Sequence, residues 1–355
     1  MKFNSLKIGT LVAKIPIIQG GMGIGVSSSK LASAVANEGG IGIISAAQLG
    51  YTQSNFKDNP LKANIEALKR HIKTAKANAS NGIIGVNIMV ASNHYKEHVL
   101  AAIDAGVDLI ISGAGLPTML PKIVKDSAVK IAPIVSSLKS AKVILKIWDK
   151  HDNVAPDMVV IEGPKAGGHL GFKLDEINDS NFNYEKVVTD IINEVKIYEQ
   201  KYNKEIPVVV AGGVFDGNDI AKYLKLGAKG VQMATRFVVT EECDASQAFK
   251  DAYINCSKED IVIVKSPVGM PGRAIKNKFI ENVNNSKSKI THCYNCLTPC
   301  NPADTPYCIS EALINAVNGN LDEGLIFCGE NAYRLTKMTT VKQLMSELVT
   351  QLKNA

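Results

Sequence analysis

Residues 157–169 read Asp-Met-Val-Val-Ile-Glu-Gly-Pro-Lys-Ala-Gly-Gly-His, an apolar run that ends in a carboxylate and a glycine turn carrying one imidazole. A buried parallel strand with polar residues at its carboxyl end is how α/β enzymes place catalytic groups. The glycines lack Cβ atoms, so a flat ligand can approach the backbone while His169 projects over it. A tight turn with a surface histidine is the alternative. We predict an active site at the end of this strand.

Similar β-branched runs alternate with helical segments from residue 15 to about residue 240. The predicted strands cover residues 15–19, 41–44, 83–88, 108–111, 130–135, 157–161, 207–211 and 230–233. Eight parallel strands with intervening helices predict an α/β protein with a closed (β/α)8 TIM barrel. An open doubly wound sheet has the same local pattern, but the strand number favours the barrel.

The alternation stops after residue 240. We therefore predict that residues 1–240 form the barrel and residues 241–355 a helical, cysteine-containing extension packed on it. The chain has 355 residues, of which 46% are apolar and 21% charged. This composition is ordinary for a globular enzyme and excludes a disordered chain.

Charge and hydropathy indicate which partners to expect. The net charge of +6 comes from lysines scattered over helical segments, not from a basic patch, so nucleic acid is not an expected partner. The N-terminus lacks a signal-peptide pattern, and no uncharged run is long enough to span a membrane. We expect a cytoplasmic protein without membrane contact.

The cysteines are concentrated in the predicted extension. Four of the seven lie in one segment, at Cys293, Cys296, Cys300 and Cys308. An odd total without a secretion signal indicates reduced thiols. The spacing also permits zinc or an iron–sulfur cluster, but it lacks the two separated pairs of a zinc ribbon. We predict no metal.

Two other strand ends carry candidate ligand-binding groups. The glycine-rich loop at residues 19–25 does not match G-x-G-x-x-G, and no acidic residue ends the next strand, which argues against a dinucleotide site. The loop suits backbone approach to a flat ring, with a plain helix entry as the alternative. The amide of Asn87 can donate to and accept from a heteroaromatic edge, although it can also cap a turn.

The last two predicted strands end in turns typical of phosphate binding. Gly212-Gly213 follows the seventh strand, and residues 232–235 end the eighth. In TIM barrels these two loops converge on an anion with backbone amides and a helix N-terminus. Each turn alone is commonplace, but both on these strands predict a cofactor that carries a phosphate.

Five segments in order, residues 16–22, 85–87, 166–169, 211–213 and 232–237, resemble the nitronate monooxygenase family, formerly called 2-nitropropane dioxygenases. The resemblance spans residues 5 to about 280. Flavin-dependent enoyl-acyl-carrier-protein reductases II share the fold and most of these motifs. The resemblance implies a (β/α)8 barrel that binds FMN without a covalent link.

The resemblance also assigns roles to single residues. It implies that His169 is the catalytic base. The residues expected to bind the cofactor are Gly21, Met22, Asn87, Glu162, Gly167, Gly168, Gly212, Gly213, Gln232, Met233, Ala234 and Thr235. Ala234 stands where the family usually has Gly. Glu162 stands where many monooxygenases have Gln and is closer to the reductase pattern.

These expectations favour oxidation of alkyl nitronates by FMN and oxygen. His169 would take the α-proton of a neutral nitroalkane or, when protonated, hold the nitronate oxygens, and an unperturbed pKa near ~6.5 suits both tasks. The alternatives are reduction of an enoyl thioester by NAD(P)H and FMN, and a non-enzymatic flavin-binding sensor. The sequence leaves the oligomeric state open, with a homodimer as one option.

Overall fold

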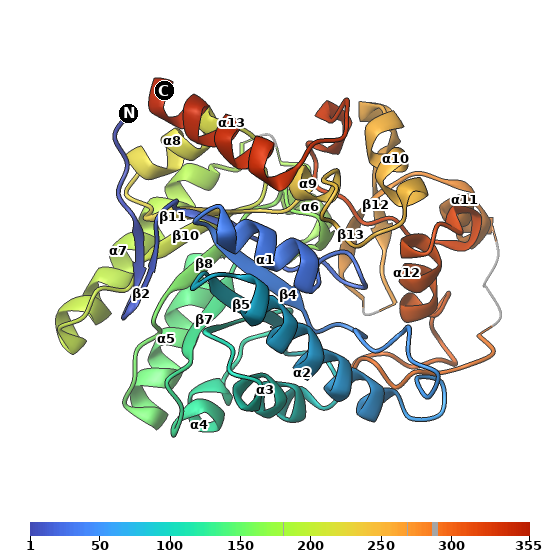
Figure 1. Ribbon diagram of the computed structural model, residues 1–355, viewed down its shortest axis with the longest axis horizontal. Helices are drawn as coiled ribbons and strands as arrows, with labels where there is room; N and C mark the ends of the chain where they lie inside the picture. The colour runs from blue at the N-terminus through green and yellow to red at the C-terminus, as the bar shows by residue number, and fades with distance from the viewer. Residues whose placement is uncertain (180, 268, 286–289) are drawn as a thin grey trace.

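Eight parallel strands form a closed barrel in the computed structural model, which describes residues 1–179, 181–267, 269–285 and 290–355. Figure 1 shows strands of this barrel with helices around them. Around the barrel the order is β10-β11-β3-β4-β5-β6-β7-β8. The strands are β3 (Ile17–Gln19), β4 (Ile41–Ser45), β5 (Ile83–Met89), β6 (Leu109–Gly113), β7 (Lys130–Val135), β8 (Val159–Glu162), β10 (Val208–Ala211) and β11 (Gly230–Met233). The predicted TIM barrel is confirmed, and the open sheet is excluded.

Amphipathic helices surround the barrel, each with one face buried against the strands. They are α1 (Ser29–Asn37), α2 (Pro60–Asn78), α3 (Tyr95–Asp104), α4 (Leu120–Val124), α5 (Leu138–Asp152), α7 (Tyr184–Tyr202) and α8 (Gly217–Lys225). Local sequence sets their ends. For example, Ser137 accepts a hydrogen bond from the Ser140 amide at the start of α5, and Asn153 in the left-handed conformation ends it.

A short hairpin closes the end of the barrel opposite the predicted site. It consists of β1 (Leu6–Ile8) and β2 (Leu11–Ala13), which pair in antiparallel fashion. The buried side chains of Leu6, Ile8 and Ala13 pack with inward-facing residues of the barrel strands. The barrel interior is therefore filled from this end, and space for a ligand is left at the other.

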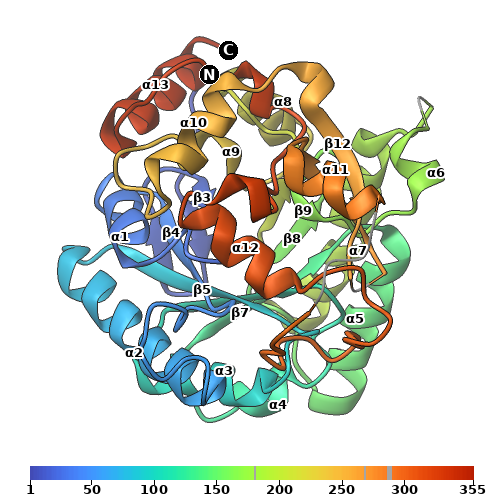
Figure 2. The same cartoon turned by 90° about the vertical axis from the view of Figure 1, so that its right-hand side faces the viewer.

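The chain after residue 240 contains strands as well as the predicted helices. Its elements, with the short α9 (Thr235–Val238) before them, are α10 (Gln247–Asn255), η1 (Lys258–Asp260), β12 (Ile261–Lys265), β13 (Pro271–Ile275), α11 (Lys278–Asn285), α12 (Ile309–Val317), η2 (Leu321–Glu323), η3 (Ala332–Arg334) and α13 (Val341–Asn354). Figure 2 shows α10, α11 and α12 lying over one end of the barrel. This end is the one that the carboxyl ends of the strands face.

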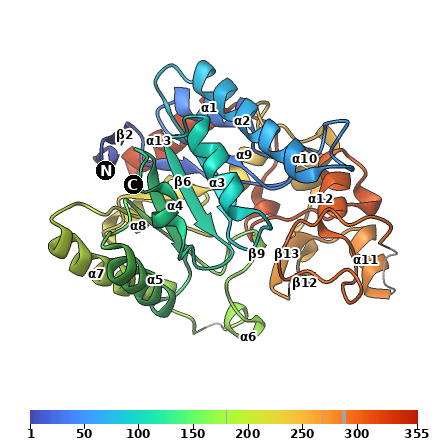
Figure 3. The same ribbon diagram turned by 90° about the horizontal axis from the view of Figure 1, so that it is seen from below.

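A three-stranded sheet joins the extension to the barrel. Strand β13 pairs with β12 and with β9 (Gly168–His169), a strand formed by the predicted glycine turn itself. Figure 3 shows β9, β13 and β12 side by side, with the small helix α6 (Leu174–Ile177) further along the same loop. The loop that carries the candidate histidine is thus part of a sheet made by residues about 100 positions later.

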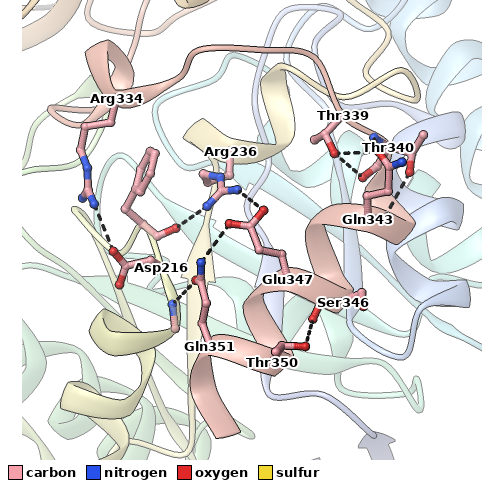
Figure 4. A network of polar contacts seen from close by, with 12 residues as sticks. Asp216, Arg236, Arg334, Thr339, Thr340, Gln343, Ser346, Glu347, Thr350 and Gln351 are labelled. Atoms are coloured by element: carbon pink, nitrogen blue, oxygen red, sulfur yellow. Dashed lines mark hydrogen bonds and ion pairs between the residues drawn. The ribbon is translucent and has the colours of Figure 1, made fainter. Parts of the chain in front are cut away.

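The final helix returns to the outer layer of the barrel. Helix α13 contacts both α8 and α1, so it occupies the position of the helix that would follow the last barrel strand. The chain therefore leaves the barrel for the extension and returns to the barrel with α13. The domain boundary at residue 240 stays a prediction. Figure 4 shows polar contacts that fix this helix: Arg236 with Glu347 at 3.0 Å, and Gln351 accepting from the Gly217 amide at 2.9 Å.

We predict that α13 stabilises the whole barrel. Leu348 is 0% exposed and belongs to the main core, so Leu348→Ala should lower the free energy of unfolding by about 2–5 kcal/mol. Lys342→Ala on the exposed face of the same helix is the matched control and should change it by less than about 0.5 kcal/mol. Urea unfolding of both variants measures the difference. Equal midpoints would show that α13 adds little to the barrel.

Candidate active site

A cavity of about 610 Å³ lies at the carboxyl ends of the barrel strands. All the residues predicted to bind the cofactor line it, and so does His169. These residues come from the carboxyl ends of β5, β8 and β11 and from the loops after β3, β8, β10 and β11, so the barrel brings together segments that are up to about 200 positions apart in the sequence. Ligand contact by each residue remains a prediction, but their convergence on one cavity is established.

The turn after β10 has a backbone that favours glycine. Gly212 has a φ of 87° and Gly213 a φ of 92°, a region that side chains with a Cβ rarely adopt. A Cβ at Gly212 would lie 2.7 Å from the Gly163 carbonyl oxygen. The turn therefore packs directly on the loop after β8 and presents backbone to the cavity.

Two amide side chains border the loop after β3. A Cβ at Gly21 would lie 2.5 Å from Asn87 Cβ, and one at Gly20 would lie 3.2 Å from Gln232 Cγ. The loop thus lies close against the ends of β5 and β11. Both amides face the cavity, where each can donate and accept hydrogen bonds.

His169 is held by the extension. In strand β9 it pairs with Gly272 of β13, and its Nε2 lies 2.6 Å from Ser266 Oγ. The edge of the ring meets Phe327, with 5.1 Å between centroids. Burial lowers the pKa of His169 to about 4. At neutral pH the imidazole is therefore uncharged, in contrast to the unperturbed pKa expected from the sequence.

Glu162 ends strand β8 inside the same cavity. Burial raises the pKa of its carboxyl to about 7. Within the described residues no ion pair includes this carboxyl. A carboxyl that is neutral below about pH 7 and charged above it therefore faces whatever the cavity binds.

Polar side chains of the extension hold the loop between Glu162 and His169 and the turn after β10. Arg273 of β13 donates to the carbonyl oxygens of Pro164, at 2.8 Å, and of Ala166. Asn331 Nδ2 donates to the Gly213 carbonyl oxygen at 2.8 Å. Sequence patterns did not identify Arg273, Asn331, Ser266 or Phe327, because no local motif marks them. Contacts between the extension and the barrel loops, such as the pairing of β13 with β9 and the bond from Asn331 to Gly213, bring them to the site.

The cysteine-bearing segment forms one wall of the cavity. Tyr294, Cys296 and Leu297 line it, and Asn93 holds the segment by donating to Asn295 Oδ1 at 2.7 Å. All seven cysteines are free thiols. In the described part of the chain, no three His, Cys, Asp or Glu side chains form a group that could hold a metal ion. Likewise, no described helix is long and apolar enough to cross a membrane.

A closed barrel with a cavity at its carboxyl-end face, lined by His169 and also by His94 and His98, is the arrangement of a TIM-barrel enzyme. Residues 4–351 match the family described as nitronate monooxygenase, and the chain belongs to this family of oxidoreductases. A probable nitronate monooxygenase of Staphylococcus saprophyticus is 28% identical over 317 residues, covering 82% of this chain and 83% of that protein. Another, of Staphylococcus haemolyticus, is 27% identical and covers 99% of this chain and 98% of that protein.

Solved structures agree with the fold. FabK from Thermotoga maritima superimposes with a TM-score of 0.72 and 26% identity, covering 96% of this chain and 93% of that chain. Nitroalkane oxidase from Streptomyces ansochromogenes has a TM-score of 0.72 at 18% identity, covering 96% of both chains, and shows the same fold.

Proposed function

We propose that this protein uses FMN and molecular oxygen to oxidise alkyl nitronates. The observation that carries the proposal is the single cavity in which His169, the Gly212–Gly213 turn and Asn87 meet, in a chain of the nitronate monooxygenase family. Its volume of about 610 Å³ is within the ~300–1,000 Å³ typical of cofactor sites. The residues present therefore fit a flavin mononucleotide.

Each group would contribute to binding in a different way. Backbone amides of the Gly212–Gly213 turn and of residues 232–235 would hold the phosphate, since the absent Cβ atoms allow close approach. The Asn87 amide would bond the polar edge of the ring. Gly21, Met22, Glu162, Gly167 and Gly168 would border the ring itself. When bound, FMN supplies the transfer of electrons from the nitronate to oxygen.

His169 would act in its neutral form. A neutral imidazole can accept the α-proton of a nitroalkane with its free nitrogen, and it can donate a hydrogen bond to a nitronate oxygen. Because burial lowers the pKa of His169 to about 4, an imidazolium that attracts the nitronate by charge is not part of the proposal. Its contact with Ser266 Oγ at 2.6 Å would fix the ring orientation.

The buried carboxyl of Glu162 leads us to predict that nitronate turnover depends on pH. Burial raises its pKa to about 7, so above pH 7 a carboxylate would share the cavity with an anionic nitronate. Like charges ~4–8 Å apart repel by about 2–4 kcal/mol at an effective dielectric constant of ~20. We expect kcat/KM for propyl nitronate to fall by about 30-fold or more from pH 6 to pH 9, and Glu162→Gln to remove this fall. The matched control Glu205→Gln, at an exposed position, should retain it. An unchanged profile in Glu162→Gln would contradict the assignment.

Enoyl thioester reduction is the second candidate. The acid at Glu162, which is closer to the reductase pattern, and the similarity to FabK favour it. In that case NAD(P)H would be the reductant, and His169 would lie near the carbon that receives the proton.

Separate anaerobic additions of propyl nitronate and NADH, followed by admission of oxygen, test the two candidates. We expect the nitronate to bleach the flavin absorbance and to support oxygen uptake, and NADH to do neither quickly. Rapid bleaching by NADH with reoxidation by crotonyl thioester would assign the reductase instead. No response to either compound would reject both candidate functions.

We further propose a cytoplasmic location and small-molecule partners without nucleic acid.

A further inference from the structure

Three charged residues lie together at the edge of the cavity. Lys165 Nζ is 3.1 Å from Glu330 Oε1, and Arg273 Nη2 is 3.7 Å from Glu330 Oε2. Two cations therefore share one carboxylate, which leaves a surplus of one positive charge. Arg273 is buried and donates to backbone carbonyls of the loop, so Lys165 is the cation with freedom to meet a ligand.

The stem of Lys165 lies across the Gly212–Gly213 turn. A Cβ at Gly213 would lie 2.9 Å from Lys165 Cβ and 3.1 Å from Lys165 Cδ. The side chain lines the cavity and is still 58% exposed. Its ammonium group can therefore reach an anion held by this turn without losing its hydration in the free protein.

The segment that carries Glu330 is fixed to the same turn. The Glu330 amide donates to the Lys165 carbonyl oxygen at 3.2 Å, and Asn331 donates to the Gly213 carbonyl oxygen. A Cβ at Gly329 would lie 2.5 Å from Thr235 Oγ1, so this segment also packs against the end of β11. Residues 329–331 thus form an outer wall around the turns expected to bind phosphate, and Glu330 holds Lys165 at that wall.

We infer that Lys165 binds the phosphate group of the flavin and makes the protein select FMN over riboflavin. The inference rests on the proposed function, because it takes the flavin as the ligand of this cavity. A lysine ammonium strengthens hydrogen bonding to a phosphate dianion by charge, whereas riboflavin offers no anion at this place. Sequence patterns gave Lys165 no role, since its partner Glu330 lies 165 positions later in the chain.

The test compares FMN and riboflavin binding to the full-length protein freed of its flavin, by quenching of flavin fluorescence. Lys165→Met should weaken FMN binding about tenfold and leave riboflavin binding within about twofold. Lys165→Arg keeps the charge and should restore FMN affinity to within about threefold. Lys7→Met, exposed on the hairpin at the opposite end of the barrel, is the matched control and should change neither affinity.

Added salt provides a second readout. The dissociation constant of FMN should rise more steeply with potassium chloride in the unchanged protein than in Lys165→Met. Equal FMN affinity in both would overturn the inference, and so would a parallel loss of FMN and riboflavin, which would indicate a disturbed loop. If the unchanged protein binds neither flavin, the proposed function fails rather than the role of Lys165.

Discussion

His169→Ala is expected to lower kcat/KM for a neutral nitroalkane by at least about 100-fold, the usual contribution of a general base. A preformed nitronate has already lost its α-proton, so its turnover should fall by about tenfold or less, through the lost hydrogen bond alone. The ratio of the two losses separates proton abstraction from binding. Steady-state oxygen uptake with 2-nitropropane and with propyl nitronate measures both.

His151→Ala is the matched control for this change. His151 is exposed in the last turn of α5 and lies outside the cavity, so both substrates should be turned over at the unchanged rate. Nitroalkane turnover within about tenfold in His169→Ala would contradict a role for His169 as the base.

Gly212→Ala is expected to yield protein that has lost most of its flavin, with affinity lowered by about 100-fold or more. Gly212 has a φ of 87°, and a Cβ there would meet backbone atoms of Gly163 at 2.7–3.0 Å, which cannot move aside as a flexible side chain would. The strain costs about 1–2 kcal/mol, and relief of the clash must displace the turn expected to bind phosphate. The measurement is the flavin-to-protein ratio after purification and the affinity for added FMN.

Gly106→Ala is the control that separates the effect of backbone strain from the effect of displacing the turn at Gly212. Gly106 has a φ of 82°, close to that of Gly212, but a Cβ there has nothing within 4 Å and it lies outside the cavity. Both variants should therefore lose similar stability through the backbone, and only Gly212→Ala should lose flavin. Full flavin content in Gly212→Ala would show that this turn does not hold the cofactor.

The barrel could be predicted because its signals are local. The runs at residues 130–135 and 230–233 are strands with the predicted bounds, and β3 is two residues shorter at its start than predicted. Short apolar runs rich in β-branched residues and bounded by turn residues mark such strands. The polar residues at the strand ends then had to converge, since all parallel strands of a barrel end at one face.

The environment of His169 could not be predicted, because it depends on pairing over long distances in the sequence. Ser266 is 97 positions from His169, and the pairing of β9 with β13 has no local signature. This pairing buries the imidazole, so its pKa falls to about 4 instead of remaining unperturbed. The position of α13 in the barrel wall is unpredictable for the same reason, since its amphipathic pattern does not specify its partner helices.

The central claim is that the cavity at the barrel mouth holds FMN. Denaturing the purified protein and identifying the released chromophore by its mass and absorbance tests this claim most directly. The account predicts a yellow protein that releases FMN at about one molecule per chain. A colourless protein that also fails to bind added FMN would contradict it.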